Sequence, residues 1–341
     1  MLDTTTSDTS IDVVQRKQGL RQRAQQLLHT YPYVSPLVLL ILTMVIFSVL
    51  NPRFGTPNSL SLLLQQTAVT AALGIGQTLI ILTAGIDLSV GAITVLSMMF
   101  MATLASQNGV PGPAAVVIGA LVGMGAGLLN GLLVTQFNLP PFIVTLGSLS
   151  IWTAIALLFS GGSTILNDDM PAALNFMGEG FRVGPFFLTT GVLATVIMYL
   201  VVGFALSQTA WGQHVYAVGD DPEAARLAGI NSKKLLLSVY LLAGLIYGIT
   251  AWILIGRTGA ATPNAIGTAN LESITAVVIG GTSLFGGRGR LIGTLFGALI
   301  VQAFNFGLSL AGVNQQWQVL SIGVLVIAAV AVDQWIRKVG S

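Results

Sequence analysis

Charged side chains are too scarce in this sequence to cover the surface of a water-soluble globule. Asp, Glu, Lys and Arg make up 8% of the 341 residues, whereas about a quarter is usual in soluble proteins. Hydrophobic residues make up 54% and gather in long runs with few charges or none. A bilayer offers the backbone no hydrogen-bond partners, so apolar runs of about 20 residues form helices there. The sequence therefore predicts an all-α polytopic membrane protein.

Ten apolar runs qualify as membrane-spanning helices, and clusters of Pro and Gly mark several of their ends. No small-residue cleavage site follows the first run, so we expect it to be a retained span rather than a signal peptide. Together the runs form one transmembrane domain, 33–337, after a cytoplasmic N-terminal segment, 1–32. The predicted spans cover 33–50, 60–82, 89–106, 113–135, 141–160, 187–207, 235–256, 270–285, 291–310 and 318–335.

Lys and Arg are distributed unevenly between the two sides of the membrane. With the N-terminus inside, eleven of the fourteen fall on the inner side. Short loops rich in Lys and Arg stay in the cytoplasm, so both chain ends are predicted to be cytoplasmic. This topology places a polar segment, 208–234, inside and a long loop, 161–186, outside. The chain has a net charge of +2, but its basic residues are scattered at the edges of the apolar runs rather than clustered on one face, which does not indicate nucleic-acid binding.

A short helix is predicted within the polar segment. Asp220, Asp221 and Pro222 are typical of a helix start, because a carboxylate caps free amide hydrogens and Pro suits the first position. Gly229, followed by Asn231, is typical of a helix end. Alanines in between leave a slim surface that suits close docking. Taken alone, the pattern is more typical of an ordinary solvated loop helix.

Motifs for catalysis or energy supply are missing from the sequence. The glycine-rich stretch 280–290 lacks the Lys and hydroxyl pair of a phosphate-binding loop, so we expect no ATP site in this chain. There is no Cys, and the two histidines lie at predicted membrane edges. No arrangement of a nucleophile with a base, and no metal-ligand set, can be assembled. We therefore predict no catalytic, cofactor or metal site.

Six polar residues within or beside the spans are candidates to line a translocation path. Asp87 is also placed to cap the helix that follows it, and Glu272 suits the first turn of a helix. Hydrogen bonds between helices are the commoner use of such side chains in membranes. Both interpretations stay open for the set, which is Gln77, Asp87, Asn130, Glu272, Gln302 and Asn305.

Glycine patterns suggest an internal repeat and close helix packing. Residues 85–91 (GIDLSVG) resemble 281–287 (GTSLFGG), and each stretch follows a span predicted to run inward. Transporters often carry such repeats, although chance similarity is the alternative in a chain with 40 glycines. Glycines spaced four apart predict close helix contacts. These are Gly119, Gly123 and Gly127 in one span and Gly244 and Gly248 in another.

Four stretches taken together resemble the ribose-type permease family of ATP-binding-cassette (ABC) importers. They are GIDLSVGA (85–92), NGLLVT (130–135) with LPPFIVTLG (139–147), GDDPEAARLAGI (219–230) and GGTSLFGG (280–287). They occur in the family's order, and the similarity covers roughly residues 35–337. The resemblance implies a subunit of the bacterial inner membrane that carries a monosaccharide such as ribose, fructose or xylose.

The resemblance also implies partners and a mechanism. A separate cytoplasmic ATPase uses ATP and Mg²⁺, a periplasmic sugar-binding protein delivers the substrate, and a second permease copy completes the path, as a homodimer. The loop 161–186 is a candidate contact for the binding protein. Residues of the polar segment match the short helix that docks into the ATPase. These are Asp220, Glu223, Ala224, Ala225, Arg226 and Gly229.

An ion-coupled secondary transporter of small polar solutes is the main alternative. Such a transporter needs buried carboxylates or other ion ligands within the membrane. In this sequence only Asp87 and Glu272 lie close enough to a span to serve. A membrane-embedded enzyme is disfavoured, because the sequence lacks a nucleophile, base or metal constellation.

Overall fold

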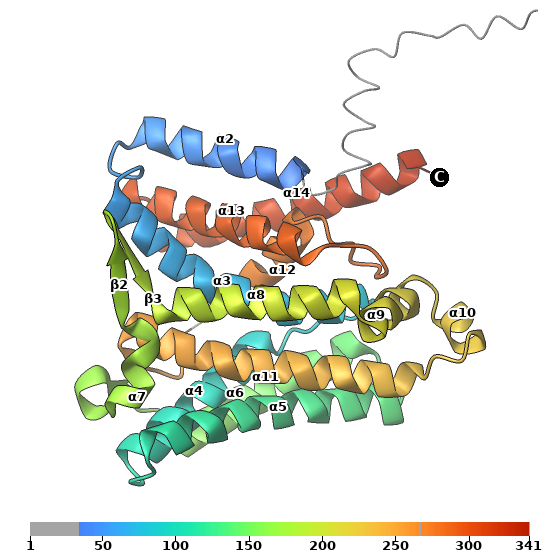
Figure 1. The fold of residues 1–341 in the computed structure, drawn as a ribbon, viewed down its shortest axis with the longest axis horizontal. Helices are drawn as coiled ribbons and strands as arrows, with labels where there is room; N and C mark the ends of the chain where they lie inside the picture. Colours follow the sequence, from blue (N-terminus) through green and yellow to red (C-terminus); the bar gives the residue numbers. More distant parts are fainter. Residues whose placement is uncertain (1–33, 266, 341) are drawn as a thin grey trace, which may run out of the picture.

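Helices form almost all of the structure, a computed structural model that describes residues 34–265 and 267–340 (Figure 1). The N-terminal segment 1–32, with its four basic residues, lies outside the described residues. Each of the ten predicted runs contains one helix. These helices are α2 (Val34–Leu50), α3 (Pro57–Leu82), α4 (Val90–Ser106), α5 (Gly112–Gln136), α6 (Pro141–Ser160), α8 (Thr190–Gln208), α11 (Ser232–Thr258), α12 (Ala269–Ile279), α13 (Leu291–Leu310) and α14 (Gln315–Gly340).

Six of the described helices are long and apolar enough to cross a membrane: α3, α5, α6, α8, α11 and α13. The helices α2 and α4 are apolar but have only 17 residues each. Many of the side chains on α2, α6 and α8 are exposed hydrophobic residues, which suits contact with lipid. The prediction of an all-α polytopic membrane protein is confirmed.

The run predicted to span 270–285 instead holds a half-length helix. The helix α12 has 11 residues, about 16 Å at 1.5 Å per residue, and ends where the chain turns at Gly280 and Gly281. Near its start, Glu272 accepts a hydrogen bond from Thr70 at 3.4 Å. Thr70 lies at the middle of the 26-residue α3. The helix α12 therefore begins level with the middle of α3, and the prediction of a complete span here is wrong.

Short elements lie at the two ends of the helical bundle. Figure 1 shows the hairpin β2–β3 and α7 at one end and α9 and α10 at the opposite end. This agrees with the opposite sides on which the Lys and Arg distribution places loop 161–186 and the polar segment. The bounds are β1 (Ile165–Leu166), α7 (Ala172–Asn175), β2 (Gly180–Val183), β3 (Phe186–Thr189), α9 (Ala210–Asp220), α10 (Pro222–Leu227) and β4 (Ala260–Ala261), with 3-10 turns at Asn167–Asp169 and Phe176–Gly178.

Two small antiparallel sheets shape the hairpin end. In one, β2 and β3 form the hairpin, with Gly180 opposite Thr189. In the other, β1 pairs with β4, and Ile165 lies opposite Ala261. The strand β4 belongs to the connection between α11 and α12. This pairing therefore ties loop 161–186 to a segment about a hundred residues away.

The helices α5 and α11 pack closely against each other. A Cβ atom added to Gly127 would lie 2.3 Å from the carbonyl oxygen of Tyr240, and one added to Gly244 would lie 2.3 Å from the carbonyl oxygen of Gly123. The backbones of the two helices are thus in direct contact. The predicted close packing is confirmed, and α11 carries two of the largest fully buried side chains, Tyr240 and Tyr247.

The two similar glycine stretches meet at the α9–α10 end of the bundle. The amide of Gly287 donates a hydrogen bond to the carbonyl oxygen of Leu82 at 3.0 Å. We call the connection 83–89, between α3 and α4, the first glycine loop, and 280–290, between α12 and α13, the second glycine loop. The two loops therefore lie side by side, each after a helix that ends at this end of the bundle. The internal repeat itself stays a prediction.

We expect Gly127→Ala to destabilise the protein by about 1–3 kcal/mol, because the new methyl group overpacks the contact between α5 and α11. Gly125→Ala is the matched control, since a Cβ atom at Gly125 on the same helix meets nothing within 4 Å. Thermal unfolding of both variants in detergent, at one scan rate, measures the difference. Equal unfolding temperatures would show that the contact does not stabilise the bundle.

Candidate functional site

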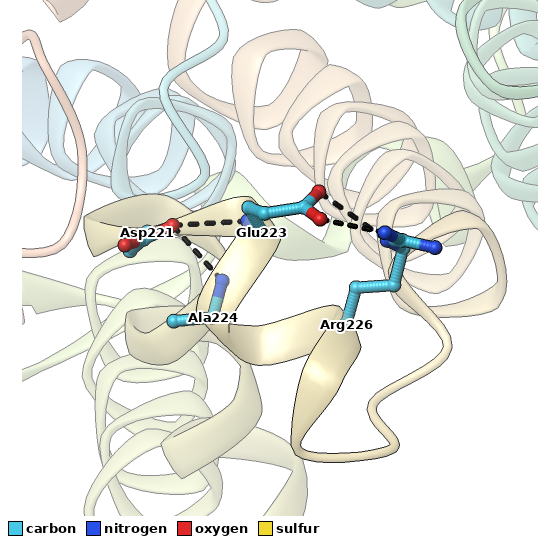
Figure 2. A network of polar contacts seen from close by, with 4 residues as sticks. All are labelled: Asp221, Glu223, Ala224 and Arg226. Atoms are coloured by element: carbon cyan, nitrogen blue, oxygen red, sulfur yellow. Dashed lines mark hydrogen bonds and ion pairs between the residues drawn. The ribbon is translucent and has the colours of Figure 1, made fainter.

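The short helix predicted in the polar segment is present as α10, and Asp221 starts it. Its Oδ1 accepts hydrogen bonds at 3.0 Å from the backbone amides of Glu223 and Ala224 (Figure 2). Pro222 occupies the first position of the helix. Asp220 was expected to help open this helix but is the last residue of α9. Asp220 and Asp221 therefore belong to different helices, and only the second is a cap.

An ion pair lies along the exposed side of α10. Nη2 of Arg226 is 2.6 Å from Oε1 of Glu223, and its Nε donates to Oε2 at 3.3 Å (Figure 2). Both side chains are 67% exposed. Such a pair stabilises a helix by at most about 1 kcal/mol. Its main effect here is to hold a carboxylate and a guanidinium in a defined arrangement on the surface.

Gly229 ends α10, as predicted. It adopts φ +86°, and its amide donates to the carbonyl oxygen of Arg226 at 3.0 Å. The next amide, of Ile230, donates back to Ala225, which closes the helix end. Asn231, expected to contribute to this stop, instead caps α11 through a bond from the amide of Lys234 at 3.0 Å. The Asp221 cap and the Gly229 turn therefore define α10 as a short, separate helix between α9 and α11.

The exposed surface of α10 differs from the prediction in two residues. Ala225 was expected on the slim docking surface, but it is 4% exposed and packs against the core. Ala224 and Ala228 are exposed, as expected. Leu227, which sequence reasoning overlooked, is 77% exposed. Leu227 therefore adds one exposed apolar side chain beside the Glu223–Arg226 pair.

The helix α9, which the sequence analysis did not predict, connects α10 to the bundle. Thr209 caps its start by accepting from the amide of Gly212. The Tyr216 hydroxyl donates at 3.0 Å to the carbonyl oxygen of Gly289 in the second glycine loop. Burial raises the pKa of this hydroxyl, although the charge of Arg290 opposes the shift. The hydroxyl therefore remains protonated and able to donate at any physiological pH.

Three of the six candidate path residues form one cluster around Glu272. Its Oε2 accepts from Nε2 of Gln302 at 2.9 Å, and its Oε1 accepts from Nδ2 of Asn305 at 3.4 Å. Thr268 donates to Oε1 at 2.9 Å, which confirms that Glu272 takes part in the first turn of a helix. Thr70 on α3 bonds both Gln302 and Glu272. The cluster links α3, α12 and α13 at the level where α12 begins.

Two further candidates, Asp87 and Asn130, belong to a second cluster. Ser148 donates to Oδ1 of Asn130 at 2.5 Å, Asn130 donates to Ser89 at 2.9 Å, and Ser89 donates to Asp87 at 2.6 Å. The Asp87 carboxylate also accepts from the amide of Ser89 at 2.7 Å. The helix α4 begins only at Val90, so Asp87 bonds the residue before that helix rather than its first turn. The cluster joins the first glycine loop to α5 and α6.

Gln77 stands apart from both clusters. It is fully buried on α3, two turns beyond Thr70, and neither polar atom of its side chain has a partner among the described residues. Between the clusters, Oδ1 of Asn270 accepts at 2.8 Å from the amide of Gly91. The starts of α12 and α4 therefore meet. Local sequence patterns did not reveal Thr70, Ser89, Ser148 or Asn270, because each acts through contacts with distant segments.

Among the described residues, no group of His, Cys, Asp or Glu is arranged to hold a metal ion. The site therefore consists of a charged, exposed step at one end of the bundle and two polar clusters inside it. This combination defines a multi-pass membrane protein with an exposed, charged helix at one end and a polar interior.

Comparisons with known proteins identify the family. A family profile described as the permease component of a branched-chain amino acid transport system matches residues 59–330. The fructose import permease protein of Rhizobium meliloti is 48% identical, covering 98% of this chain and 95% of that protein. The ribose import permease protein of Bacillus subtilis is 37% identical, covering 88% and 92%. The D-allose transport system permease protein of Escherichia coli is 36% identical, covering 88% and 91%.

The chain belongs to the ribose-type permease family of ABC importers. It is the membrane-spanning kind of subunit and a transport component rather than an enzyme. The resemblance inferred from the four sequence stretches is confirmed.

We expect Asp221→Ala to weaken the start of α10 by about 1 kcal/mol, because two amide hydrogens lose their acceptor. Hydrogen exchange at Glu223 and Ala224 should then be about fivefold faster. Asp220→Ala is the control, since the Asp220 side chain makes neither cap bond. Equal exchange in the two variants would contradict the role of Asp221 as the cap.

Proposed function

We propose that this chain is the permease subunit of an ATP-driven importer that carries a monosaccharide across the bacterial inner membrane. The relatives named for fructose, ribose and allose support a monosaccharide as the substrate class. The single structural observation that carries the proposal is α10. A membrane protein with no phosphate-binding loop presents a capped, rigid, exposed helix at one end of its bundle, where a motor protein can dock.

Docking is assigned to the exposed side of α10. Glu223 and Arg226 offer one charge of each sign in a defined arrangement, and Leu227 offers an apolar contact beside them. Ala224 and Ala228 let a partner backbone approach closely. Ala225 and Gly229 serve the same surface indirectly, by seating and ending the helix. The partner is a cytoplasmic ABC ATPase that supplies the ATP and Mg²⁺ chemistry.

The remaining organisation follows the sidedness that the basic residues predict. The polar segment 208–234 is cytoplasmic, and the loop 161–186 faces the periplasm, where a sugar-binding protein docks. The transmembrane domain extends over 33–337, and a second copy of the chain completes the path as a homodimer. Within each copy, the Glu272 cluster, the Asp87 cluster and the separate Gln77 contact the passing sugar at its hydroxyl groups.

We expect Glu223→Lys to weaken association with the ATPase at least tenfold. The reversal removes the carboxylate and places two cations side by side on α10. The fold should be unaffected, because an exposed pair contributes at most about 1 kcal/mol. Co-purification of the ATPase and a binding titration measure the effect. Glu179→Lys, on loop 161–186 at the opposite end, is the control, and unchanged association of the Glu223 variant would contradict the docking assignment.

The source of energy separates the proposal from an ion-coupled transporter. Proteoliposomes that contain the permease, its ATPase and the binding protein should take up sugar only when ATP is present on the side of the membrane where the ATPase is bound. Proteoliposomes that contain the permease alone should take up none on a proton or sodium gradient. Gradient-driven uptake by the permease alone would refute the ATP-driven mechanism.

A further inference from the structure

Three segments that are distant in sequence meet backbone to backbone beside α10. They are the end of α9, the end of α3 with the first glycine loop, and the second glycine loop. A Cβ atom added to Gly219, at the end of α9, would lie 1.8 Å from the carbonyl oxygen of Leu82. One added to Gly287 would lie 2.7 Å from the Asp220 backbone, and one added to Gly286 would lie 2.6 Å from the carbonyl oxygen of Gly219. We call this contact the three-segment junction.

Hydrogen bonds hold the junction together. Gly287 donates to the carbonyl oxygen of Leu82, and Tyr216 on α9 donates to the carbonyl oxygen of Gly289. Gly286 and Gly287 have φ values of +84° and +68°, a region that side chains strongly disfavour. The second glycine loop therefore follows a path around the end of α9 that other residues would not readily adopt. No flexible side chain separates the three backbones, so a displacement of one must displace the others.

Each glycine loop is continuous with an element that carries residues of a polar cluster. The first loop continues through Asp87 and Ser89 to the start of α4, where Gly91 bonds Asn270 of α12. The second loop continues into α13, which carries Gln302 and Asn305. The end of α9 is thus in contact with the second glycine loop, which continues into α13, and with the end of α3, from which the first glycine loop starts. One residue separates the end of α9 from the start of α10, so the junction lies directly beside the start of α10.

We infer that the three-segment junction transmits movement of the docked α10 to both polar clusters, with Gly219 and Tyr216 as positioning residues for coupling. This inference rests on the proposed docking of α10, but it assigns a different task to different residues. Docking uses the exposed side chains of α10, whereas transmission uses buried contacts at the end of α9. The two tasks can therefore be lost separately.

The test measures sugar uptake and ATP hydrolysis together in the reconstituted transporter with its ATPase and binding protein. Gly219→Ala forces the backbones of α9 and α3 apart, so uptake per ATP hydrolysed should fall at least tenfold while the ATPase still associates. Tyr216→Phe removes one hydrogen bond with little change of shape, and uptake per ATP should fall about two- to fivefold. Gly147→Ala is the control, since a Cβ atom there meets nothing within 4 Å.

The ratio of uptake to hydrolysis decides the outcome. A folded Gly219 variant with unchanged uptake per ATP would overturn the inference. Loss of ATPase association in step with uptake would also overturn it, because the junction would then serve only to form the docking surface. Tyr216→Phe keeps the test valid if Gly219→Ala does not fold. If Glu223→Lys leaves association intact while Gly219→Ala uncouples, the docking surface is misassigned and the junction stands.

Discussion

The direct backbone contact between α5 and α11 is the constraint on which the rest of this structure depends. Inside a bilayer, lipid is as apolar as the side chains, so helices associate mainly through close packing and hydrogen bonds. Gly123, Gly127, Gly244 and Gly248 permit that approach. The helix α11 in turn begins right after α10 and ends right before β4. One long helix, packed against α5 at its centre, thus connects α10 at one end of the bundle with the small β1–β4 sheet at the other.

Local patterns predicted most of the fold, and the exceptions have a common cause. The span 141–160 was predicted residue for residue, because Pro140 and Pro141 mark its start and Gly161, in a left-handed conformation, marks its end. The second half of 270–285 contains no charged residue, so the predicted span was extended through it. Gly280 and Gly281 end the helix at that point, and the bond between Thr70 and Glu272 sets its depth. Neither effect is visible in a sliding average of hydrophobicity.

In the candidate site, too, local features were predictable from the sequence, whereas features that depend on contacts between distant segments were not. The caps of α10 are local chemistry, so Asp221 and Gly229 were predictable from the order of residues. The inward direction of Ala225 was not, because it depends on how α10 rests on its neighbours. The polar residues inside the bundle were singled out individually, but their grouping needed the fold. Glu272, Gln302 and Asn305 come together only because α12 and α13 pack side by side, and their role in a translocation path stays a prediction.

The pairing of β1 with β4 has a consequence for how the two faces of the molecule communicate. Two residues from each strand fasten loop 161–186 to the connection that enters α12. Among the described residues of that connection, β4 is the one regular element between α11 and α12. The chain therefore runs from the β1–β4 sheet into a helix that begins level with the middle of α3 and whose first turn holds Glu272. This half-length helix is joined to the sheet at its start and to the second glycine loop at its end, so it links the two ends of the bundle.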